Sequence, residues 1–170
     1  MLVYYLKNGT SMNFNFYELL KLKKDPFYRP IKNLLKFHPK SLKYYKRAFT
    51  HRSSNKKDLN GVAVNYERLE FLGDSILSSI ISSYLFKNIP TGSEGYLTQM
   101  RSKIVSRNHL NELGMELNLL EFLDANISVE NYGDNIHGNL FEALVGAIFL
   151  DRGYSSVSYT HLRAHETDYY

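Results

Sequence analysis

The chain has 170 residues and a mass of 19.8 kDa, which is the size of one ordinary domain and too small for two full ones. With 44% hydrophobic and 22% charged residues, and no apolar run near the roughly 20 residues that span a bilayer, its composition excludes a disordered tail and a membrane protein. Cysteine is absent, which excludes disulfides, thiolate metal sites and cysteine nucleophiles. The first residues lack the layout of a secretory signal, so we expect a cytoplasmic protein.

The net charge of +4 hides two oppositely charged halves. Residues 1–57 hold 14 Lys and Arg against two acids, whereas the remainder holds 7 Lys and Arg against 15 Asp and Glu. Aromatic residues are interleaved with the basic ones, a composition that suits a polyanionic partner, because cations that neutralise phosphates release counterions. The alternative is an ordinary solvated basic face.

Turn and breaker residues divide the chain into pieces of helical length, so we predict an all-α fold. A weak strand pattern is confined to residues 12–16. The predicted helices span residues 16–24, 31–35, 41–49, 66–86, 94–116 and 139–150.

The helix predicted over residues 66–86 follows Asn65, a good N-cap, and is mostly apolar. Three acids interrupt that pattern. At about 100° per residue, Glu67, Glu70 and Asp74 share one narrow face of the helix. Carboxylates crowded in this way repel one another and lose hydration if buried, which favours a compensating divalent cation. The alternative is that Glu67 complements the helix N-terminus and the other two face water.

The helix predicted over residues 139–150 carries a single charge, Glu142, in an apolar run. Asn139 lies on the same face, and Gly146 can let a facing helix approach closely. If that facing helix carries Glu70 and Asp74, four oxygen-bearing side chains converge, a donor set that suits Mg²⁺ with Mn²⁺ as a substitute. Otherwise Glu142 simply pairs with a Lys or Arg.

Other candidates carry a weaker signal. Glu94 opens a helix, where the helix dipole alone favours an acid, so a structural role competes with a catalytic one. His51 can donate to a phosphate or pack as an ordinary buried histidine. His161 and His165 have a metal-ligand spacing without a third ligand nearby. The candidate RNA-contacting residues are His51, Arg52, Arg101, Lys103 and Arg107.

The run Asn65-Tyr66-Glu67-Arg68-Leu69-Glu70-Phe71-Leu72-Gly73-Asp74-Ser75-Ile76-Leu77 resembles the signature of the ribonuclease III family. Further matches are Thr50-His51-Arg52-Ser53, Glu94-Gly95, Met100-Arg101, Ile104-Val105 and the run from Phe141 to Asp151. The resemblance implies an all-helical, homodimeric endonuclease that hydrolyses double-stranded RNA with Mg²⁺, as in the processing of rRNA and mRNA precursors.

Carried over by position, the resemblance makes Asp74 and Glu142 catalytic residues, and Glu70, Asn139 and Glu142 metal ligands. Glu67 and Glu94 correspond to supporting acids. Many members of the family have Asp where this chain has Asn139, whose carbonyl can ligate Mg²⁺ without contributing a negative charge.

The resemblance covers residues 31–154, which we predict to be the catalytic domain. Residues 1–30 form a basic N-terminal extension. Residues 155–170 are expected to be a non-native tail, in place of the closing helix and the double-stranded-RNA-binding domain.

Three hypotheses for the function compete. A non-catalytic RNA-binding or assembly protein with the same fold would be expected to lose at least one acid, so retention of Glu70, Asp74 and Glu142 favours the endonuclease. A di-iron carboxylate oxidase requires Glu-x-x-His pairs. Because Gly73 and Val145 occupy the positions three residues after Glu70 and Glu142, that reading fails.

Overall fold

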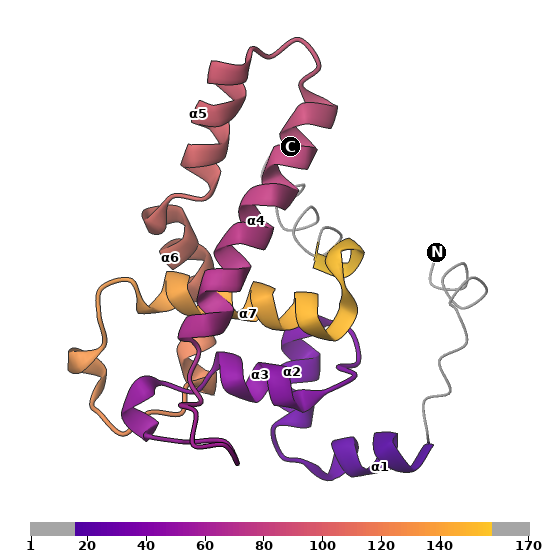
Figure 1. Cartoon of the computed structure of the whole chain (residues 1–170), viewed down its shortest axis with the longest axis vertical. Coiled ribbons are helices and arrows are strands. Elements are labelled where there is room, and N and C mark those ends of the chain that lie inside the picture. The colour runs from indigo at the N-terminus through magenta and orange to yellow at the C-terminus, as the bar shows by residue number, and fades with distance from the viewer. Residues whose placement is uncertain (1–15, 158–170) are drawn as a thin grey trace. The chain divides into compact units, whose positions relative to one another are not determined.

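The structure is a computed structural model that describes residues 16–157 (Figure 1), and no β-strand is present among them apart from two isolated bridges. The all-α prediction is confirmed. The helices are α1 (Phe16–Lys24), α2 (Tyr28–Leu35), α3 (Leu42–Ala48), α4 (Glu67–Asn88), α5 (Glu94–Ile104), α6 (Arg107–Glu116) and α7 (Ile136–Arg152), with short 3₁₀ turns at Arg52–Ser54, Leu119–Phe122 and Val129–Asn131. Most of the possible strand at residues 12–16 lies outside the described residues, and Phe16 begins α1.

The chain divides into two compact units, residues 1–39 and residues 40–170. The first unit contains α1 and α2, and the second contains the remaining helices. The domain boundary expected at residue 30 falls inside α2, because Pro30 does not break that helix. Pro30 is its third residue, and proline is tolerated there since the first N–H groups of a helix have no intrahelical partner.

The second unit is built around α7, on which α3, α4 and α6 pack. α7 is apolar on most of its circumference, as a helix surrounded by others must be. Its buried residues are Ile136, Gly138, Leu140, Phe141, Ala143, Leu144, Val145, Gly146, Ala147, Ile148 and Asp151. Figure 1 shows α4 crossing α7 near the start of α4, with α5 beside the later part of α4 and α6 below α5 near α7.

The end of α7 is tied to the start of α3 by one buried carboxylate. Asp151 accepts hydrogen bonds from the backbone N–H groups of Lys40 (2.9 Å) and Ser41 (2.7 Å) and from the hydroxyl of Tyr45 (2.9 Å). Burial and the neighbouring carboxylate raise the pKa of Tyr45, so the phenol stays a donor. These charge-assisted bonds fix the helix that carries Glu142 within the second unit.

The single helix predicted over residues 94–116 is wrong, because the structure contains two. α5 ends at Ile104, and α6 starts at Arg107 after Ser106, whose hydroxyl accepts a hydrogen bond from the N–H of His109 at 3.4 Å. A serine in this position satisfies a donor that the first turn would otherwise leave without a partner. The break brings Arg107 to the beginning of a helix.

α4 is the one described helix with the length and mean hydropathy (1.2 over its best window) of a membrane span. A core helix meets the same criterion. Glu67, Glu70 and Asp74 lie in its first turns, and its buried stripe packs on α7. Within the fold, 33% of that apolar window is buried.

Candidate active site

Two glycines bring the backbones of α4 and α7 together. A Cβ atom added at Gly73 would lie 1.8 Å from the carbonyl oxygen of Glu142, and one added at Gly146 would lie 2.4 Å from the carbonyl oxygen of Leu69. Only glycine permits so close an approach. The predicted role of Gly146 is confirmed, whereas the sequence interpretation overlooked Gly73.

This crossing places the acids of α4 beside those of α7. Glu67, Glu70 and Asp74 occupy the first two turns of α4, and Asn139 and Glu142 occupy the first two turns of α7. All five line one cleft of about 1240 Å³ in the second unit. The expectation that the facing helix of α7 is the one with Glu70 and Asp74 is confirmed.

Two carboxylates of the cleft have a raised pKa. Burial raises the pKa of Glu142 from its ordinary value of 4.5 to about 7, with further contributions from Asp74 and Glu70. Burial and the charge of Glu67 likewise raise the pKa of Glu70. Arg107 opposes both shifts. The cleft therefore disfavours the ionised forms of Glu142 and Glu70, mainly through burial.

Asn139 is held by Tyr66. Its side chain forms a hydrogen bond with the Tyr66 hydroxyl and lowers the pKa of that group, as a donor to the phenol oxygen does, although burial raises the pKa overall. Tyr66 is only 7% exposed, and its N–H donates to the carbonyl of Thr50 at 2.9 Å. An amide that donates through its NH₂ group to Tyr66 leaves its carbonyl oxygen as an acceptor for another partner.

Comparisons with known proteins agree with this arrangement. Residues 42–164 match the family model described as ribonuclease-III-like. The chain belongs to the ribonuclease III family. The match continues past Tyr154, where the resemblance was expected to end.

Curated relatives named ribonuclease 3 include those of Zunongwangia profunda, 62% identical over 128 residues, and Flavobacterium psychrophilum, 59% identical over 128 residues. Each alignment covers 75% of this chain, but only 53% and 52% of the respective relative. The chain thus spans about half the length of these ribonuclease III proteins.

Solved structures show the same fold. The nuclease domain of ribonuclease III from Campylobacter jejuni superposes with a TM-score of 0.71 at 29% identity, over 82% of this chain and 96% of that one. A Dicer from Pichia stipitis superposes with a TM-score of 0.53 at 25% identity, over 76% and 59% of the two chains. The ribonuclease III nuclease fold is therefore established for this chain.

The basic candidates separate into two groups within this ribonuclease III fold. Arg52 and Arg107 line the cleft, and Arg52 lies 3.8 Å from Glu67 in an exposed ion pair. Arg101 and Lys103 do not line it. Arg101 instead donates to the Ser82 hydroxyl at 3.1 Å, which attaches α5 to α4. Its guanidinium has a structural partner that sequence reasoning did not foresee.

Glu94 also lies outside the cleft. It begins α5, is exposed, and accepts a hydrogen bond from the Thr98 hydroxyl at 3.0 Å. An acid in the first turn of a helix complements the helix dipole. These contacts supply the structural role that was weighed against a catalytic one for this residue.

His51 lines the cleft as a packed, neutral histidine. It is 6% exposed, and its Nδ1 accepts a hydrogen bond from the N–H of Ser53 at 3.1 Å. An accepting Nδ1 carries no proton, so the proton of the neutral ring is assigned to Nε2. Burial lowers the pKa further, and the ring packs against Tyr66 and Tyr132 at 5.9 and 5.7 Å between centroids. These contacts agree with the alternative in which His51 packs as an ordinary buried histidine.

Several polar residues of the cleft were not singled out from the sequence. They are Ser53, Asn55, Tyr66, Asn111, Asn131, Asp134 and Asn135. Asn111 is the best anchored, because its side chain accepts from the N–H of Gly138 at 2.7 Å and donates to Asn135 at 3.2 Å. It stabilises the first turn of α7, which holds Asn139. The asparagines near Gly133 were the available signal, and loops rich in this residue usually mark turns.

The donor set fits a hard divalent cation. Among the described residues, no group of three or more His, Asp or Glu side chains is arranged so that it could hold a metal ion by itself. Mg²⁺ does not require one, since it typically takes one or two carboxylates and keeps several waters. Burial first, and the neighbouring acids second, raise the pKa of Glu142 and Glu70, and a bound cation would favour their ionised forms. Of the residues that line the cleft, Glu70, Glu142 and Asn139 carry oxygen atoms that could hold such an ion. The predicted histidine pair, His161 and His165, lies outside the described residues.

Proposed function

We propose that this chain contains the nuclease domain of an Mg²⁺-dependent endonuclease that hydrolyses phosphodiester bonds in double-stranded RNA, as in rRNA and mRNA precursor processing. The observation that carries the proposal is the convergence of Glu70, Asp74 and Glu142 in one cleft at the crossing of α4 and α7. Membership of the ribonuclease III family and the relatives named ribonuclease 3 support it.

Each residue of the cleft has a distinct task in this proposal. Glu70 and Glu142, with the Asn139 carbonyl, hold the metal, and Asp74 adds negative charge beside them. A Mg²⁺ ion held by these residues would supply Lewis-acid chemistry, which activates a water molecule and offsets charge on the phosphate and the leaving oxygen. Arg107, whose charge already reaches Glu70 and Glu142, is placed to contact a phosphate next to the scissile bond. Glu67 and Arg52 flank the same opening.

We further propose that the active form is a homodimer. Phe71 follows Glu70 on α4 and is 79% exposed, and Leu72 beside it is half-buried. Large aromatic side chains exposed next to a functional cleft favour a protein contact over open solvent. The C. jejuni nuclease domain has a region involved in dimer formation, and this similarity supports a two-fold arrangement here.

The test is incubation of the chain with a long RNA duplex in Mg²⁺, with EDTA as the matched control. We expect internal cleavage that depends on the metal, and little cleavage of a single strand of the same sequence. The rival function, a non-catalytic RNA-binding or assembly protein, predicts binding of the duplex without cleavage in either condition. That outcome would overturn the proposed nuclease.

A further inference from the structure

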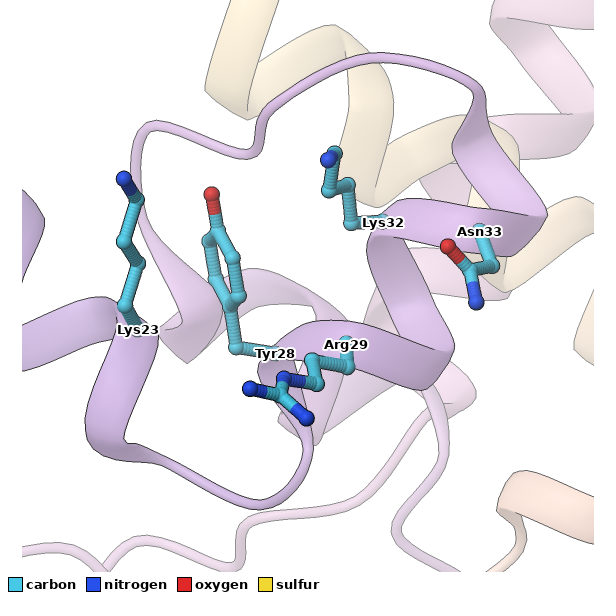
Figure 2. A pocket seen from close by; sticks show the side chains of 5 residues that line it. All are labelled: Lys23, Tyr28, Arg29, Lys32 and Asn33. Carbon is cyan, nitrogen blue, oxygen red and sulfur yellow. The ribbon is translucent and has the colours of Figure 1, made fainter.

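A second polar pocket lies in the first unit, far along the sequence from the acids. Lys23 at the end of α1 and Tyr28, Arg29, Lys32 and Asn33 on α2 line a space of about 350 Å³ (Figure 2). This volume is at the lower end of the range of ligand pockets, about 300–1,000 Å³. Unlike typical small-molecule pockets, this one has no aliphatic lining residue. An apolar ligand is therefore a poor match.

The pocket concentrates positive charge without a matching acid. In the described part of the chain, Lys23, Arg29 and Lys32 form no ion pair with any carboxylate. The carboxylate of Asp25 accepts a hydrogen bond from the N–H of Phe27 at 3.0 Å, at the start of α2. Three cations that share one pocket repel one another, and an anion bound among them relieves that repulsion.

The wall of the pocket is fixed in place. Tyr28 is only 3% exposed, and its hydroxyl is 2.6 Å from Nδ1 of His38 in a hydrogen bond. Figure 2 shows its ring standing between the side chains of Lys23 and Lys32, with Arg29 at its base. The cationic side chains thus surround a rigid aromatic support. A guanidinium matches two phosphate oxygens at once, and the two ammonium groups act as point charges beside it.

We propose that this pocket, formed by Lys23, Tyr28, Arg29, Lys32 and Asn33, binds a backbone phosphate of the RNA substrate. The proposal rests on the proposed function, because it names a second place at which the same substrate is held. The family model begins at residue 42, so the pocket lies outside the part of the chain that the model matches. Residues 1–57 carry 14 basic against two acidic residues, which favours a polyanion over a single small anion.

A phosphate contact of this kind predicts a defined dependence on salt. Each neutralised phosphate contributes about 0.9 to the slope of log affinity against log salt concentration. One such contact therefore strengthens binding about eightfold at about 0.1 M salt relative to about 1 M salt. The contact carries no base information, so its loss weakens binding equally for duplexes of different sequence. Cleavage at saturating RNA is unaffected, because the acids of the second unit are unchanged.

The experiment compares two triple variants of the whole chain. Lys23→Gln/Arg29→Gln/Lys32→Gln removes the charges of the pocket, and Lys21→Gln/Lys24→Gln/Lys36→Gln removes three exposed charges of the same unit outside it. Duplex affinity is measured in EDTA over a series of salt concentrations, with helicity and the unfolding midpoint as checks on the fold. Arg29→Gln alone serves if the triple variant is misfolded, and it is expected to lose part of the same affinity.

We expect the pocket variant to bind about eightfold more weakly at about 0.1 M salt, with a slope smaller by about 1, while the control variant changes much less. Equal losses in both variants, or none in either, would overturn the pocket. So would weaker binding of the pocket variant to vesicles containing phosphatidylserine with unchanged RNA binding, since that identifies a membrane as the partner. A chain that binds RNA through the pocket but does not cleave it with Mg²⁺ refutes the nuclease proposal alone.

Discussion

Gly73 of α4 lies so close to Glu142 of α7 that a methyl group on Gly73 would meet the Glu142 carbonyl oxygen at 1.8 Å. The backbone of one helix thus sets the position of the acid on the other. The shared cleft of Glu70, Asp74 and Glu142 depends on this separation, because all three side chains extend from the two helices near the crossing.

Gly73→Ala should therefore force α4 and α7 apart. Overpacking of this kind costs about 1–3 kcal/mol in the free energy of unfolding, and contact with a backbone oxygen places it at the upper end. Urea unfolding measures the loss. Gly95→Ala in α5 is the matched control, since a Cβ there meets nothing within 4 Å and alanine favours a helix by up to about 1 kcal/mol. Equal stability of the two variants would contradict the close crossing.

Glu142→Gln should abolish cleavage while RNA binding stays nearly intact. The substitution keeps the size of the side chain but removes a charged ligand at the centre of the acid cluster. The phosphate contacts are made by other residues and persist. Cleavage and gel-shift assays on one preparation measure both quantities. Undiminished cleavage by the variant would refute the assignment of Glu142 to the metal site.

The raised pKa of Glu142 predicts a pH dependence of stability in the metal-free protein. Its pKa is about 7 in the fold against an ordinary value of 4.5, so the folded state binds more protons than the unfolded state between these values. The associated stability is fully present below about pH 4.5 and is lost as the pH rises through about 7.

The measurement is urea unfolding in EDTA at about pH 5 and about pH 8. The wild-type chain should lose more stability over that interval than Glu142→Gln, which cannot titrate at this position. Because Mg²⁺ binds the ionised carboxylate, added metal should offset the loss at the higher pH. An identical pH dependence in the two proteins would show that Glu142 ionises normally.

The proposed homodimer can be tested on the surface of α4. Light scattering at micromolar concentration should give twice the mass of one chain. Phe71→Asp should shift the population to monomer by placing a charge in the apolar contact. Phe86→Asp changes an aromatic residue of similar exposure, 73% against 79%, at the other end of α4, and should leave the dimer intact. A monomeric wild-type chain would contradict the proposal.

The sequence predicted most helices and the acids that line the cleft, because both depend on local patterns. The spacing of Glu67, Glu70 and Asp74 follows from helix geometry, and the single charge of α7 marks Glu142. The break before α6 escaped notice because a serine cap amid polar residues is a weak signal.

Tertiary contacts account for the remaining differences. Arg101 has a charge that suits RNA, but the residue it contacts, Ser82, is on another helix, and spacing within α5 carries no information about that pairing. Gly73 was overlooked for the same reason, because its importance depends on which part of α7 faces it. Periodicity therefore locates side chains around a helix, whereas the identity of the opposite surface requires the packed structure.

The final prediction concerns the amide in the acid cluster. The side chain of Asn139 forms a hydrogen bond with the hydroxyl of Tyr66 and lines the same cleft as Glu142. Asn139→Asp adds a negative charge where Glu142 already has a raised pKa, so the metal-free protein should become less stable. The same charge should tighten Mg²⁺ binding and lower the concentration needed for half-maximal cleavage.

A magnesium titration at one fixed pH, followed by both cleavage and the unfolding midpoint, separates the possible roles of Asn139. Tyr66→Phe is the companion variant, because it keeps the ring and removes only the partner of the amide. In a chain that keeps Asn139, Tyr66→Phe should raise the Mg²⁺ concentration needed for half-maximal cleavage if the orientation of the amide matters for metal binding. A higher requirement in Asn139→Asp would mean that the new carboxylate repels Glu142 more than it binds metal. An unchanged midpoint in both variants would place Asn139 outside the surroundings of the ion.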